Sequence, residues 1–98
     1  MNIAKELEDK KLTISIDGRL DTSTAPELDE ELKASLEGVE ELVMDITNME
    51  YISSAGLRVL LSAQKAMNAQ GEMVVVGAND TVMEIFDITG FADILTIR

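Results

Sequence analysis

Two adjacent serines, Ser53 and Ser54, are the side chains of this sequence with the clearest capacity for chemistry. They precede Ala55 and Gly56 in the segment YISSAGLRVLL, residues 51–61. A serine directly before a helix commonly caps it, because several backbone N–H groups at a helix N-terminus have no partner inside the helix. The same place also tolerates a phosphate, because it carries partial positive charge. Either serine is therefore a candidate for helix capping or for phosphorylation.

Composition excludes most other roles for these hydroxyls. The 98 residues include no histidine and no cysteine, which excludes Ser-His and Cys-His nucleophile pairs and zinc sites built on these residues. The net charge is −11, from 8 basic and 19 acidic residues, and this opposes nucleic-acid binding because phosphate backbones bind cationic surfaces. The negative charge serves either solubility or steering toward a basic partner.

The length and hydropathy of the chain predict one small domain. Ninety-eight residues suit a single core, so we expect one domain over residues 1–98. No apolar run reaches the length of a membrane span, and the N-terminus lacks the apolar centre of a signal peptide. We therefore expect a cytoplasmic protein with no membrane partner, no metal and no cofactor.

Hydrophobic patterning predicts the strands that must position the serines. Leu12, Ile14 and Ile16 alternate with polar residues, which is typical of a half-buried strand. The continuous apolar run at residues 72–78 is typical of a strand in the middle of a sheet covered on both sides. The predicted strands are residues 2–9, 11–18, 42–46, 72–78 and 92–98.

Capping and turn residues predict three helices. Thr24 is expected to cap the first one, with Glu27 three residues later and Gly38 after its end. In the second helix we expect Arg58 and Gln64 to face outward. The predicted helices are residues 24–37, 54–70 and 79–89. The alternation of strands and helices predicts an α/β fold with parallel crossover units, and residues 47–56 form the loop that leads to the serines.

Three segments, GRLDTSTAPEL, LVMDITNMEYISSAGLRVLL and GEMVVVGANDTVMEIFDITGF, resemble a STAS domain in sequence and in spacing. The resemblance covers about Leu12 to Ile97 and is greatest to the bacterial anti-sigma factor antagonists. It implies the STAS fold, a mixed sheet of four to five strands with about three to four helices packed against it.

The resemblance also implies a function in partner switching. An unphosphorylated antagonist of this family binds an anti-sigma factor that is also a serine kinase, which frees a sigma factor. Phosphorylation by that kinase releases the antagonist, and a serine phosphatase resets it. The implied protein is a monomeric binding module and not an enzyme. The alternative is a partner-switching or scaffold module outside sigma-factor control, in secretion, motility, or nucleotide or lipid binding.

The family signature places the phosphoacceptor on Ser54, with Ser53 as the alternative. Ser53 stands where the family frequently has an aspartate, so it adds a second hydroxyl and removes a charge. Asp21 and Asp45 match acidic family positions near the acceptor, and each is either a partner contact or a structural carboxylate. Tyr51 is expected in the core. The residues assigned to partner binding are Asp21, Ser53, Ser54, Ala55, Gly56, Leu57 and Arg58.

Overall fold

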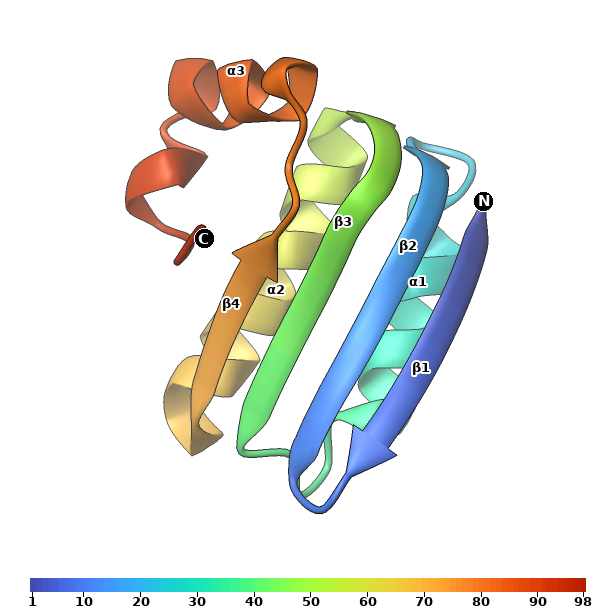
Figure 1. The fold of residues 1–98 in the computed structure, drawn as a ribbon, viewed down its shortest axis with the longest axis vertical. Helices are drawn as coiled ribbons and strands as arrows, with labels where there is room; N and C mark the ends of the chain where they lie inside the picture. Colours follow the sequence, from blue (N-terminus) through green and yellow to red (C-terminus); the bar gives the residue numbers. More distant parts are fainter.

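A four-stranded mixed sheet with strand order β1-β2-β3-β4 runs through the molecule (Figure 1). The computed structural model describes all residues, 1–98. The strands are β1 (Asn2–Glu8), β2 (Lys11–Leu20), β3 (Glu41–Ile52) and β4 (Glu72–Val76). The helices are α1 (Ala25–Ser35), α2 (Ser54–Gln70), α3 (Asp80–Thr89) and the short 3₁₀ helix η1 (Phe91–Asp93).

The connections confirm the predicted α/β organisation. Strand β1 pairs with β2 in antiparallel fashion, whereas β2 with β3 and β3 with β4 are parallel pairs. Helices α1 and α2 make the two parallel crossovers, and both lie on the same face of the sheet, behind it in Figure 1. Helix α3 lies beyond the carboxyl end of β4. The carboxyl ends of β2 and β3 therefore meet at one edge, next to the start of α2.

The core between the sheet and the helices is aliphatic, in keeping with an aromatic content of only 3%. The alternating residues Leu12, Ile14 and Ile16 of β2 are all buried, and Phe86 of α3 is the one large aromatic side chain that is fully buried. Gln64 is also buried, at 7% exposure, so the outward orientation expected for it is wrong. Its Nε2 donates to Asn68 Oδ1 at 2.9 Å. One amide thus occupies the apolar stripe of α2.

Strand β3 is longer than the pattern at residues 42–46 predicts. It continues to Ile52 because two register shifts against β2 insert extra residues, between Ser15 and Asp17 and again between Gly18 and Arg19. The predicted strand ends at Ile46 because the apolar run ends there, and the bulges beyond it interrupt the alternation of buried and exposed residues that would indicate a longer strand. The loop expected over residues 47–56 is therefore wrong, since Ser53 alone separates β3 from α2.

Strand β4 lies at the edge of the sheet, so its predicted central position is wrong. The strand predicted at residues 92–98 is reduced to one parallel bridge, from Val75 to Ile97, because η1 takes up the start of that segment as far as Asp93. Val75 N donates to Thr96 O at 2.8 Å and Arg98 N donates to Val75 O at 2.9 Å. These two bonds satisfy part of the backbone edge that β4 would otherwise expose.

Candidate functional site

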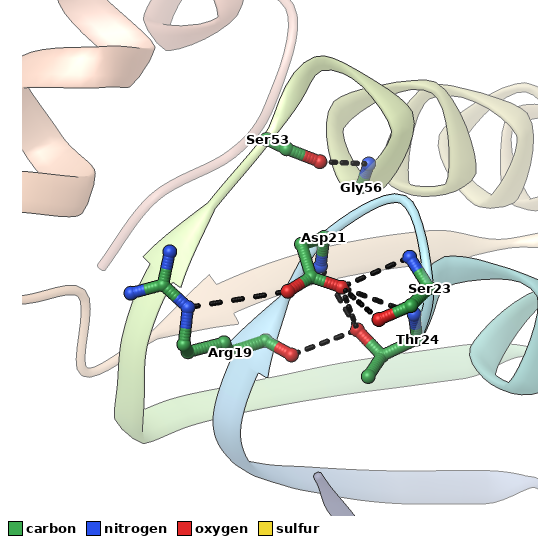
Figure 2. Close-up of polar contacts among 6 residues, drawn as sticks. All are labelled: Arg19, Asp21, Ser23, Thr24, Ser53 and Gly56. Carbon is green, nitrogen blue, oxygen red and sulfur yellow. Dashed lines mark hydrogen bonds and ion pairs between the residues drawn. The ribbon is translucent and has the colours of Figure 1, made fainter.

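The candidate residues lie where two neighbouring parallel strands, β2 and β3, reach their carboxyl ends. Arg19 pairs with Tyr51 and Leu20 with Ile52 in the β2–β3 register. Ser53 N then donates to Leu20 O at 2.9 Å, which ties the start of α2 to the end of β2. The turn that follows β2 and the first turn of α2 are therefore adjacent (Figure 2).

The two serines have different environments. Ser53 is the N-cap of α2, and its Oγ accepts from Gly56 N at 3.4 Å (Figure 2). Ser54 is the first residue of the helix; its side chain is exposed and its hydroxyl takes part in no hydrogen bond within the chain. Ser53 thus supplies the cap, which leaves the Ser54 hydroxyl accessible and free.

Of the four residues that follow Ser54, two reach the surface and two are buried. Ala55 is half-buried and Arg58 is exposed, whereas Gly56 and Leu57 are buried. A Cβ on Gly56 would lie 2.7 Å from Leu20 Cγ and 2.8 Å from Ile52 Cγ1. Gly56 therefore lets α2 approach the sheet closely, and neither Gly56 nor Leu57 presents a side chain to a partner.

Asp21 is held by a set of short hydrogen bonds in the turn between β2 and α1. Its Oδ1 accepts from Ser23 Oγ at 2.8 Å, from Ser23 N at 3.0 Å and from Thr24 N at 3.2 Å (Figure 2). The hydrogen bond from the Ser23 hydroxyl is the main cause that lowers the pKa of Asp21 below its usual 3.8; the backbone bonds add to it, and partial desolvation opposes it. Asp21 is thus ionised and holds this turn in place, and its side chain is still about one-third exposed.

Thr24 is the N-cap residue of α1, as expected, but its side chain makes no capping hydrogen bond. Its Oγ1 donates to Arg19 O at 2.8 Å and accepts from Asp21 N at 2.9 Å. The Asp21 carboxylate instead binds the free N–H groups of the turn before α1. Aspartate followed by hydroxyl residues is typical of such turns, and this signal in DTST was available in the sequence.

Tyr51 is half-buried and not in the core, contrary to expectation. The guanidinium of Arg19 lies over its ring, with 4.6 Å from Cζ to the ring centroid. Arg19 Nε also lies 3.9 Å from Asp21 Oδ2. Arg19 is a site residue that the sequence analysis missed, since its pairing with Tyr51 depends on the shifted β2–β3 register.

A shallow groove of about 310 Å³ runs between the first turns of α1 and α2, beside Ser54. Ala25, Pro26 and Val59 give it an apolar lining. Asp29 and Arg58 line the same groove on opposite helices. An apolar side chain flanked by polar groups would fit this surface.

Asp45 does not belong to this site, so the expectation of a partner contact near Ser54 is wrong for it. It lies in the middle of β3, and its Oδ1 accepts from Thr47 Oγ1 at 2.6 Å and from Thr47 N at 3.0 Å. It lines a separate cavity with Ser15 and Asp17. Nowhere in the chain do three or more carboxylates gather in a way that could hold a metal ion. No helix is both long and apolar enough to cross a membrane.

Comparisons with known proteins agree with this arrangement. The family model of the STAS domain matches residues 2–98. The anti-sigma-B factor antagonist of Staphylococcus aureus is 30% identical over 100 residues, which cover 100% of this chain and 93% of that protein.

Solved structures show the same fold. The crystal structure of an anti-sigma factor antagonist from Mycobacterium paratuberculosis has a TM-score of 0.89 at 23% identity, covering 98% of this chain and 83% of that one. The antagonist SpoIIAA, known in unphosphorylated and phosphorylated forms, has TM-scores of 0.78 and 0.77 at 14% identity; 99% of this chain is covered, with 87% and 91% of those chains. The chain belongs to the STAS domain family, and the Staphylococcus aureus relative that it matches over almost its whole length is an anti-sigma-B factor antagonist.

Proposed function

We propose that residues 1–98 work as a single cytoplasmic STAS domain that is an anti-sigma factor antagonist switched at Ser54. The unmodified chain binds an anti-sigma factor, which then releases its sigma factor. The anti-sigma factor is also the serine kinase that modifies Ser54, and a separate serine phosphatase removes the phosphate. The names of the relatives support the partner class.

The observation that carries this proposal is the exposed, unbonded hydroxyl of Ser54 at the first residue of α2. In the kinase reaction, Ser54 Oγ forms a bond to the γ-phosphorus of ATP while the bond from that phosphorus to the β–γ bridging oxygen breaks. The hydroxyl proton passes to a base of the kinase, and ADP leaves. Ser53 is less suited as acceptor because its oxygen already accepts the Gly56 N–H.

The added charge explains the release of the partner. A phosphoserine carries about −1.5 to −2 charges at neutral pH and holds a tight water shell. It would stand beside the groove that Ala55 and Val59 line, where a docked partner must displace water. Desolvating a doubly charged group to which the partner offers no cation costs several kcal/mol, which is enough to end a moderately tight association.

We propose that the domain acts by binding and does not catalyse a reaction. A serine nucleophile needs a base to take its proton, and the chain offers no histidine for that role. A fluorophosphonate probe tests this directly, since we expect no labelling of Ser54. Covalent labelling of Ser54 would contradict the binding role.

The decisive experiment is incubation with a candidate anti-sigma factor kinase and ATP, followed by intact mass measurement. We expect the wild type and the Ser53→Ala variant to gain one phosphate, and the Ser54→Ala variant to gain none. The unmodified chain should bind the same kinase and lose that binding after phosphorylation. Modification that persists in Ser54→Ala and disappears in Ser53→Ala would move the acceptor to Ser53.

A further inference from the structure

Arg58 is a cation on helix α2 that has no partner in the chain. Its exposed guanidinium forms no ion pair and no hydrogen bond, and its side chain lines the groove beside Ala55. Four other basic side chains are paired with carboxylates: Lys5, Lys10, Arg19 and Lys33. In a chain with a net charge of −11, a free guanidinium beside the candidate phosphorylation site needs an explanation.

The helix places Arg58 next to Ser54. The two residues are four positions apart in α2, so their Cβ atoms lie about 5–6 Å from each other on one side of the helix. Side chains in a helix lean toward its N-terminus, which directs the Arg58 side chain toward Ser54. The first turn of α2 contains no acidic residue that could compete for this guanidinium.

The other charged groups around the site are already engaged. Asp29 lies across the groove from Arg58, but its Oδ2 is 2.8 Å from Lys33 Nζ. Asp21 accepts hydrogen bonds within its own turn and faces Arg19, whose guanidinium lies over Tyr51. Among the cations near Ser54, Arg58 is therefore the one that is free to form an ion pair with a new negative charge.

We propose that the group bound by the Arg58 guanidinium changes with the phosphorylation state of Ser54. In the unmodified chain this guanidinium is available to a carboxylate or carbonyl group of the partner. In the phosphorylated chain it binds the phosphate oxygens of residue 54, a geometry for which a planar guanidinium is well suited. Phosphorylation then adds negative charge to the binding face and removes a cation from it in the same step. This inference rests on the proposed function, because it requires a phosphate on Ser54.

The pairing is tested without a kinase by incorporating phosphoserine at position 54 during translation of the full chain. Melting temperatures of the modified and unmodified proteins are compared in the wild type, in Arg58→Ala and Arg58→Lys, and in the control Lys65→Ala. Lys65 is an exposed, unpaired cation farther along the same helix. We expect phosphoserine to raise the melting temperature of the wild type, and Arg58→Ala to reduce this gain by about 2–4 °C.

The controls separate an ion pair from a general charge effect. Lys65→Ala should keep the full gain in melting temperature, and Arg58→Lys should keep part of it, since lysine retains the charge without the guanidinium fork. The Nε–H NMR signal of Arg58 should shift on phosphorylation. Equal gains in the wild type and Arg58→Ala, or no gain in the wild type, together with an unshifted Arg58 signal, would overturn the inference.

Partner binding distinguishes failure of this inference from failure of the proposed function. If phosphoserine 54 does not weaken binding of the anti-sigma factor to the wild type, the proposed switch itself is wrong. If it weakens binding by the same factor in the wild type and in Arg58→Ala, the switch stands and the role of Arg58 is wrong. We expect the loss of affinity on phosphorylation to be about tenfold smaller in Arg58→Ala, a factor that corresponds to about 1.4 kcal/mol.

Discussion

The hydroxyls of Ser53 and Ser54 differ in one hydrogen bond, which Ser53 Oγ accepts from Gly56 N. Removal of an N-cap hydroxyl typically costs about 0.5–2 kcal/mol, and this bond is long at 3.4 Å, so we expect Ser53→Ala to lower the free energy of unfolding by about 0.5–1 kcal/mol. Ser54→Ala removes an exposed, unbonded hydroxyl and should change it by less than about 0.5 kcal/mol. Urea unfolding of both variants measures the difference, and a larger loss for Ser54→Ala would reverse the assignment of the cap.

The Asp21 carboxylate makes a pH-dependent contribution to the stability of the fold. Because its pKa in the folded chain lies below the ordinary 3.8, the ionised carboxylate stabilises the fold above that pH, and the contribution is lost as pH falls through the lowered value. Asp21→Asn keeps one acceptor oxygen but removes the charge. We expect it to lower the urea midpoint at pH 7 and to differ little from the wild type near pH 2. Asp87→Asn, an exposed change on α3, serves as control.

The sequence predicts the contacts of these residues only where both partners are close to each other along the chain. Residue types alone leave both hydroxyls as candidate phosphoacceptors, because two adjacent serines look alike in the sequence. Only the residue at which α2 begins shows that Ser53 is the cap and that Ser54 is free. The local Asp21 turn is accessible from residue types, whereas the stacking of Arg19 on Tyr51 depends on strand register and is not.

Elements are predicted correctly where their periodicity is uninterrupted. Helices α2 and α3 begin and end close to the expected residues, because Ser53 and Asn79 cap them and Gly71 and Gly90 follow them. The end of β3 is missed because its bulges form only against β2, a contact between segments far apart in the sequence. The long loop expected before Ser54 therefore does not exist, and the acceptor stands on a rigid strand–helix junction.

The junction between α2 and β4 depends on Gly71. A Cβ at this position would lie directly against the backbone carbonyl of Glu40, and that carbonyl also accepts from Glu72 N at 3.0 Å. Because backbone cannot move aside as a flexible side chain can, we expect Gly71→Ala to cost about 3 kcal/mol or more.

Gly38 is the matched control for Gly71. It has a φ of +80°, but a methyl group on its Cα would meet no atom within 4 Å, so Gly38→Ala should cost only the left-handed backbone penalty, about 1 kcal/mol. Thermal unfolding followed by circular dichroism compares the two variants. Similar losses would show that the α2–β4 junction relaxes more readily than its geometry implies.

At the scale of the whole molecule, the charge of −11 is only weakly offset by ion pairs. The four pairs within 4.0 Å all involve partly or largely exposed side chains, and such pairs contribute about 0–1 kcal/mol each. Repulsion among the remaining carboxylates opposes the compact state. A basic partner would relieve that repulsion.

Salt should therefore stabilise this protein. Raising NaCl from about 10 mM to about 300 mM shortens the Debye length from roughly 30 Å to roughly 6 Å, which screens repulsion between distant carboxylates more than it weakens the close pairs. We expect the melting temperature at pH 7 to rise by a few degrees. Calorimetry at constant buffer composition measures this rise, and repeating the series near pH 4, where many carboxylates are neutral, should shrink the effect. A melting temperature that falls with added NaCl at pH 7 would mean that the four ion pairs outweigh the net repulsion.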